Sequence, residues 1–133
     1  MRTKLENRCL EFGVGVIKLV RNIGEKLTQK SRDQLISSAT SIGANVAEAR
    51  SAESRADFIH KLEIALKEAR ETDYWLTVLY RLTEEPTDIQ KALLQECFEI
   101  TAMLVSSVKT SKENRKLRDR IQSADVGIES RTA

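Results

Sequence analysis

The sequence predicts an all-helical protein, an up-down-up-down antiparallel four-helix bundle, and three observations support this class. The chain of 133 residues has one proline and only 5% aromatic against 32% charged residues, so it lacks the aromatic clusters of a sheet protein. Apolar residues recur at alternating spacings of three and four over long segments, which marks one buried helix face. Short connectors separate these segments, and helices joined by short connectors pack antiparallel. The length allows one domain, which we place at residues 1–116.

The first two helices are expected over about residues 3–28 and 33–51. Ser31 or Asp33 is suited to cap the second of them. The small residues from Ser37 to Ala49 allow close packing of this helix, and the alternative is a surface kept for a partner helix or a nucleic-acid backbone. The predicted apolar faces are Leu5, Cys9, Phe12, Val16, Leu19, Ile23 and Leu27 in the first helix, and Leu35, Ala39, Ile42, Val46 and Ala49 in the second.

The third and fourth helices are expected over about residues 55–83 and 88–116. Ser54 and Thr87 are suited to cap them, and Asp57 puts a carboxylate in the first turn of the third helix, where the helix dipole favours it. Between them, Pro86 disfavours helical geometry in the residue before it. The predicted faces are Phe58, Leu62, Ala65, Ala69, Thr72, Leu76 and Leu79 in the third helix, and Leu93, Cys97, Ile100, Leu104 and Val108 in the fourth, widened by Leu94, Phe98, Thr101 and Val105.

The sequence predicts neither an export signal nor a membrane-spanning segment. The first residues lack the apolar stretch and cleavage site of a signal peptide, and no run of about 18 uncharged apolar residues occurs. We therefore expect a cytoplasmic protein with no membrane partner. The polar residues 117–133 are predicted to be a frayed helix end and a disordered tail, although Leu117 and Ile121 could extend the helix by some turns.

The residues available for chemistry do not predict an enzyme. Cys9 and Cys97 lie on apolar faces and are interpreted as reduced core thiols. Asp57 and His60 have the spacing by which some bundles present a carboxylate and an imidazole to two metals, but such a centre needs a second pair, and His60 is the only histidine. Glycine-rich phosphate loops and nucleophile motifs are missing. We predict no catalytic residue, no metal and no cofactor.

The segment from Ser41 to Leu79 resembles the bacterial four helix bundle protein family. The resemblance rests on four strings in the family's order and spacing: ANVAEA from Ala44, DFIHKL from Asp57, ALKEA from Ala65 and ETDYWL from Glu71. Looser similarity extends over about residues 5–115. The family includes proteins encoded in intervening sequences of 23S ribosomal RNA genes, and it is similar to the accessory protein of diversity-generating retroelements.

This resemblance implies a four-helix bundle and a ring-like homopentamer. The retroelement relatives are linked to a reverse transcriptase and its template RNA, so a partner protein such as a reverse transcriptase is one expectation. For the subunit contact we predict Ile59, Leu66, Tyr74 and Trp75: the two aromatic residues flank the core position Leu76, and an aromatic beside a bundle core can anchor an interface. Packing of Trp75 within its own core remains an open alternative, as does base stacking.

The position of the charges is more informative than the net charge of +2. In an up-down-up-down bundle, the starts of the first and third helices meet the ends of the second and fourth at one pole. Ten cations at this pole, Lys61 among them, outnumber five carboxylates, although helix C-termini favour cations in any protein. The nucleic-acid-binding residues predicted there are Arg2, Lys4, Arg8, Arg50, Arg55, Lys109, Lys112, Arg115 and Lys116.

Two functions from different classes follow. The first is a non-enzymatic oligomer that binds RNA or a ribonucleoprotein through this basic pole, because repeated cations favour contacts with the phosphate backbone. The second is a protein-interaction scaffold, or adaptor ring, that makes no nucleic-acid contact. The two differ in salt dependence, since phosphate binding weakens steeply with salt.

Overall fold

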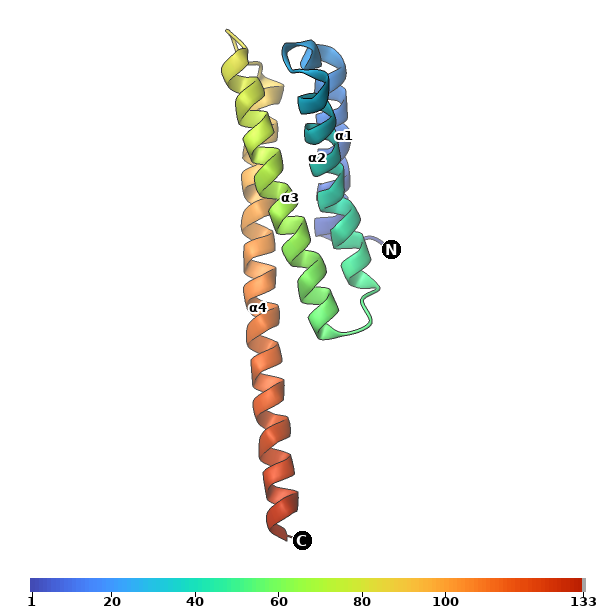
Figure 1. The fold of residues 1–133 in the computed structure, drawn as a ribbon, viewed down its shortest axis with the longest axis vertical. Coiled ribbons are helices and arrows are strands. Elements are labelled where there is room, and N and C mark those ends of the chain that lie inside the picture. The colour runs from blue at the N-terminus through green and yellow to red at the C-terminus, as the bar shows by residue number, and fades with distance from the viewer. Residues whose placement is uncertain (133) are drawn as a thin grey trace.

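The computed structural model has the predicted four-helix bundle (Figure 1). It describes the backbone of residues 1–132 and the side chains of residues 1–127. Over that range the elements are α1 (Lys4–Ile23), the short 3-10 helix η1 (Gly24–Lys26), α2 (Gln29–Arg50), α3 (Arg55–Leu82) and α4 (Asp88–Thr132). Sequence neighbours pack side by side, and a less extensive contact between α1 and α4 closes the bundle.

Most of the core consists of residues that the periodicity predicts, but Val20 belongs to it without having been predicted, and Leu5, Ile23 and Leu93 are only half-buried. All five predicted residues of α2 are buried, as are six of the seven of α3, with Phe58 half-buried at the end of the stripe. The four-helix core also holds a polar pair, because the Thr72 hydroxyl donates to the Ser38 hydroxyl across 3.0 Å. The expected widening of the α4 face is wrong for Phe98 and Val105, which are 68% and 43% exposed.

The helix starts follow local capping rules. Thr3 and Glu6 form a capping box at α1, and Ser54 accepts a hydrogen bond from the Asp57 N–H at α3. Thr87 likewise accepts from the Gln90 N–H at α4. At α2 the prediction of Ser31 or Asp33 is wrong: Thr28 is the cap, and Ser31 donates its backbone N–H to it.

The first helix ends earlier than predicted, at Ile23 instead of near residue 28. Its last predicted turn is the 3-10 helix η1 followed by extended backbone at Leu27. Leu27 is nevertheless buried, so the apolar pattern predicted its burial correctly although it lies beyond the end of the α-helix.

The largest difference from the sequence prediction concerns residues 117–133. The structure continues α4 as a helix through Thr132, where a frayed end and a disordered tail were expected, and Ala133 lies outside the described residues. Strong helix formers dominate residues 112–122, and neither Gly nor Pro occurs between Lys109 and Val126, so nothing local stops the helix. We call residues 112–132 the arm, since no described side chain of α4 after Ser111 is buried and the helix then projects past the other three (Figure 1).

Candidate nucleic-acid interface

The structure brings together the chain segments that define the predicted basic pole. A hollow of about 320 Å³ at this end is lined by Leu5 of α1, Arg50 of α2, Phe58 of α3 and Ser107 of α4, among others. The fourth helix does not end here as predicted but passes the pole and continues as the arm (Figure 1). The cations after Ser107 therefore lie along a single helix rather than around the end of a bundle.

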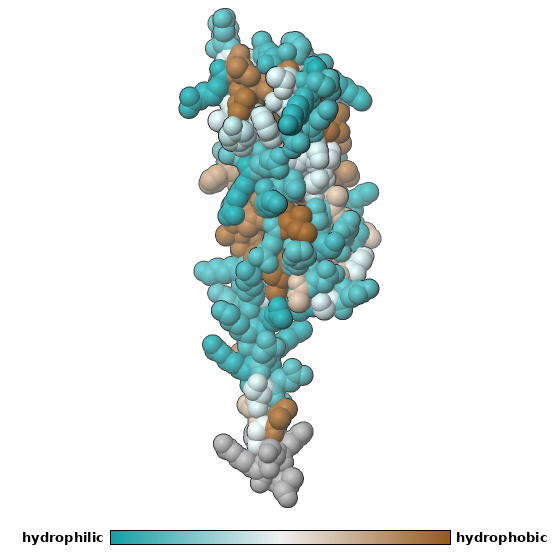
Figure 2. All heavy atoms as spheres, viewed as in Figure 1, coloured by the Kyte–Doolittle hydropathy of each residue, from teal (hydrophilic) through white to brown (hydrophobic). Residues whose placement is uncertain are grey.

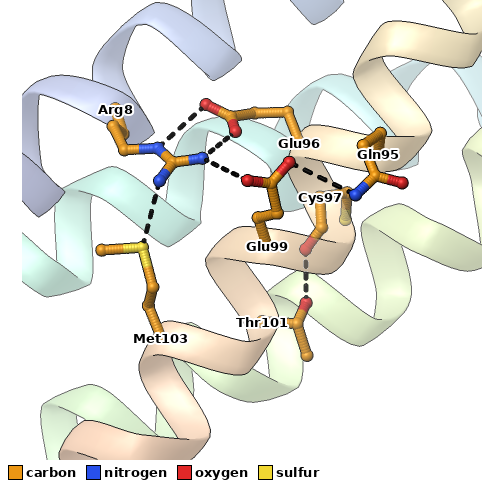
Figure 3. Close-up of polar contacts among 7 residues, drawn as sticks. All are labelled: Arg8, Gln95, Glu96, Cys97, Glu99, Thr101 and Met103. Carbon is orange, nitrogen blue, oxygen red and sulfur yellow. Dashed lines mark hydrogen bonds and ion pairs between the residues drawn. The ribbon is translucent and has the colours of Figure 1, made fainter.

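Arg8, one of the predicted binding residues, is instead held between α1 and α4. Its guanidinium donates to both carboxylate oxygens of Glu96, with 3.2 Å from Nε to Oε2, and lies 3.4 Å from Glu99 (Figure 3). A further contact of 3.4 Å joins Nη1 to the Met103 sulfur. The hydrogen bond with Glu96 raises the pKa of Arg8. This side chain connects two helices and is not free to bind phosphate.

Three more cations of the pole are also paired. Arg50 lies 3.3 Å from the buried Glu6 carboxylate and donates to the Met1 carbonyl. Lys112 lies 3.3 Å from Glu63. Lys61 lies 3.0 Å from Glu48, whose hydrogen bond raises the pKa of the lysine. The free positive charge of the pole is thus smaller than a count of residues suggests.

The remaining cations form no ion pair among the side chains that the structure describes. Arg2, Lys4, Lys109, Arg115 and Lys116 are exposed, and the Arg55 guanidinium lies 5.6 Å from the centre of the Phe58 ring.

Arg118 and Arg120 continue this surface and were missed by the sequence analysis, because they fall in the expected tail. The signal that could have found them is a run of six cations against two carboxylates over residues 109–120 with no helix breaker inside it. Cations on a helix have fixed relative positions and form an ordered surface, whereas cations in a disordered tail do not.

The predicted subunit-contact residues differ in accessibility. Ile59 is 4% exposed within one chain, so it has almost no surface to give to a partner and this part of the prediction is wrong. Leu66 and Trp75 are half-buried against the core of their own chain. Tyr74 is 61% exposed, and its ring meets that of Trp75 edge-on with centroids 5.1 Å apart. Among the residues that the structure describes, the buried indole N–H of Trp75 has no hydrogen-bond acceptor.

An apolar groove of about 380 Å³ runs between α1 and α2. Small residues form its floor, because the two helices cross closely: a Cβ added at Gly43 would lie 3.3 Å from the Cβ of Cys9. The small-residue string therefore serves close packing, as expected, and also leaves a concave surface. The lining includes Leu10, Gly13, Val14, Ile17, Gly43, Ala44 and Ala47, with Arg2 and Arg50 also contributing.

The residues considered for chemistry are dispersed. His60 is exposed on α3 and Asp57 is half-buried, and no group of three metal-ligating side chains occurs among the described residues. Both cysteines are free and buried, as predicted. No helix in the described part of the chain is long and apolar enough to cross a membrane.

The fold and this surface define a small helical-bundle protein with a basic helical extension. A family model described as "23S rRNA-intervening sequence protein" matches residues 2–106, and the chain belongs to this family. It is similar to a crystal structure of a protein with unknown function from the S23 ribosomal protein family of Bacteroides thetaiotaomicron. That match has 40% identity and a TM-score of 0.72, and it covers 79% of this chain and 98% of the other. No curated protein matches the chain significantly. The family match ends at residue 106, before the arm.

Proposed function

We propose that this protein is a non-enzymatic RNA-binding protein that contacts RNA or a ribonucleoprotein through the basic pole and the arm. The observation that carries the proposal is a set of exposed cations on one continuous helix that form no ion pair with any described side chain, Lys109, Arg115, Lys116, Arg118 and Arg120. Phosphate contacts supply most non-specific affinity for nucleic acid, and cations free of intramolecular partners are the ones that can make them. The family's description, which refers to 23S rRNA, supports the same class of partner.

We further propose that the protein acts as a homo-oligomer, and the resemblance to the four helix bundle family favours a pentamer. Large exposed apolar side chains support an association: Phe98 and Tyr74 are 68% and 61% exposed. Figure 2 shows apolar side chains gathered over the middle and upper end of the bundle, while the arm below them is mainly hydrophilic. An oligomer would repeat the basic arm and strengthen binding through multivalency.

A protein-interaction scaffold is the second candidate, and the groove between α1 and α2 favours it. The groove is lined mainly by apolar and small side chains, so it suits the apolar face of a helix from another protein better than an RNA backbone. Binding there would depend little on salt.

The test compares two triple variants in fluorescence anisotropy titrations of a labelled single-stranded RNA over a series of salt concentrations. Replacing Lys109, Arg115 and Lys116 with Gln should weaken binding and reduce the slope of log affinity against log salt by up to about 2, since each single-strand phosphate contact contributes roughly 0.7. The control replaces Lys26, Lys30 and Arg32, at the other end of the bundle, with Gln. Equal losses in both variants, or no RNA binding by the unmodified protein at low salt, would contradict the proposal and favour the scaffold.

A further inference from the structure

Three arginines from two helices line one open niche beside the start of α3. Arg55 is the first residue of α3, and Arg115 and Arg118 lie on the arm, one turn apart. The niche has a volume of about 570 Å³, within the roughly 300–1,000 Å³ typical of small-ligand sites. It joins the bundle to the arm, which otherwise projects away from the other helices (Figure 1).

The arginines occupy the face of α4 that is buried elsewhere. Leu104, Val108 and Ser111 are buried at spacings of four and three, and Arg115 and Arg118 continue that spacing beyond the bundle. This face therefore changes from apolar to arginine at the point where the other helices no longer cover it. Arg115 and Arg118 accordingly line the same hollow as Ser54, Arg55 and Ala56 at the start of α3.

The charge around the niche suits a single negative charge. Asp119 and Asp125 also line it, and no ion pair joins either of them to the three arginines among the described side chains. Three guanidiniums against two carboxylates leave one positive charge in excess. Asp57, in the first turn of α3, is half-buried, and its N–H donates to the Ser54 hydroxyl across 3.0 Å. An RNA phosphodiester carries one negative charge, and the planar guanidinium fork matches its two free oxygens.

We propose that Arg55, Arg115 and Arg118 together hold one phosphodiester of an RNA backbone in this niche. The site deepens the proposed function and rests on it, and it lies beyond the residues matched by the family model. By contacting both elements, the bound phosphate links the arm to α3. Lys116 and Arg120, on other faces of the arm, also attract phosphates, but they do not share one with α3, so each contributes less to the affinity.

The experiment uses two double variants of the full chain that remove equal charge from neighbouring positions. Arg115→Gln with Arg118→Gln removes the niche cations, and Lys116→Gln with Arg120→Gln is the matched control. With a labelled single-stranded RNA at fixed salt, we expect the niche variant to lose about tenfold or more in affinity and the control less than about threefold. Arg115→Lys with Arg118→Lys keeps the charge but not the fork, and should recover only the smaller part of the loss.

A second measurement follows the arginine side-chain N–H signals by NMR during titration with inorganic phosphate. Arg55, Arg115 and Arg118 should shift together, and Arg120 should not. Equal affinity losses in the two double variants, or phosphate shifts that spare the three arginines, would overturn the niche while leaving the proposed RNA binding intact. If the unmodified protein binds no RNA, both the proposed function and the proposed phosphodiester site in the niche are wrong.

Discussion

At the scale of single residues, burial decides which ionisable groups can react. Desolvation raises the pKa of Cys9 to about 11 and that of Cys97 to about 12, from an ordinary value of 9.0. Both thiols are therefore protonated at neutral pH, and a protonated thiol is a poor nucleophile and metal ligand. These residues act as small apolar side chains in the core.

The same pKa shifts predict a loss of stability in alkali. A raised pKa in the folded state means that the unfolded chain releases its thiol protons at lower pH than the folded chain. The stability that the two buried thiols contribute is therefore fully present below pH 9, and it is lost as the pH rises through about 11 to 12. Each thiol should add up to about 1.4 kcal/mol per pH unit to this slope. Urea unfolding between pH 8 and about 11 measures it. A variant with Cys9→Ala and Cys97→Ala should show a shallower dependence, and an unchanged slope would contradict the assignment.

At the scale of elements, the close crossing of α1 and α2 depends on the absence of a side chain at Gly43. A Cβ there would meet the Cβ of Cys9 at 3.3 Å, and the methyl groups of a valine would need still more room. Gly43→Val should therefore lower the free energy of unfolding by about 1–3 kcal/mol. The matched control is Ala44→Val at the adjacent, exposed position, which should change it much less. Urea denaturation of both variants checks this.

The arm buries none of its described apolar side chains, and apart from the ion pair of Lys112 with Glu63 it should melt separately from the bundle. Its side chains from Lys112 to Val126 are exposed, and in proteins most helical stability comes from the packing of an apolar face. Ile121→Pro should reduce the helical circular dichroism signal but leave the urea midpoint of the bundle unchanged. Ala102→Pro, on an exposed position of α4 within the bundle, should lower that midpoint strongly. A lower midpoint in the Ile121 variant would show that the arm stabilises the bundle.

At the scale of the whole molecule, the exposed apolar residues predict self-association. Light scattering at micromolar concentration should give a mass several-fold above the 15.0 kDa of one chain. Tyr74→Ala should weaken the oligomer, because this ring is exposed in a single chain, and Thr77→Ala on the same helix is the control. A stable monomer in the unmodified protein would rule out the oligomer.

The sequence by itself determined the bundle, most helix boundaries and the core. Periodicity identifies buried positions such as Leu104 and Ala65 because burial repeats with the helical turn, and caps such as Ser54 depend only on local hydrogen bonds. The sequence pattern could not predict whether residues 117–133 are helical, since an exposed helix lacks the apolar periodicity that identifies a buried one. It also missed that Thr28 caps α2, where several capping residue types lie close together.

Only the tertiary structure decided which cations remain free. Arg8 and Arg115 are the same residue type near the same pole, but Arg8 pairs with Glu96, 88 positions away in the chain, and Arg115 has no such partner among the side chains that the structure describes. Sequence spacing identifies ion pairs within one helix and not those between helices, because the latter depend on how the helices are rotated against each other. Ile59 is buried and Phe98 exposed for the same reason: the rotation of α3 and α4 about their axes sets which side of each apolar stripe faces the core.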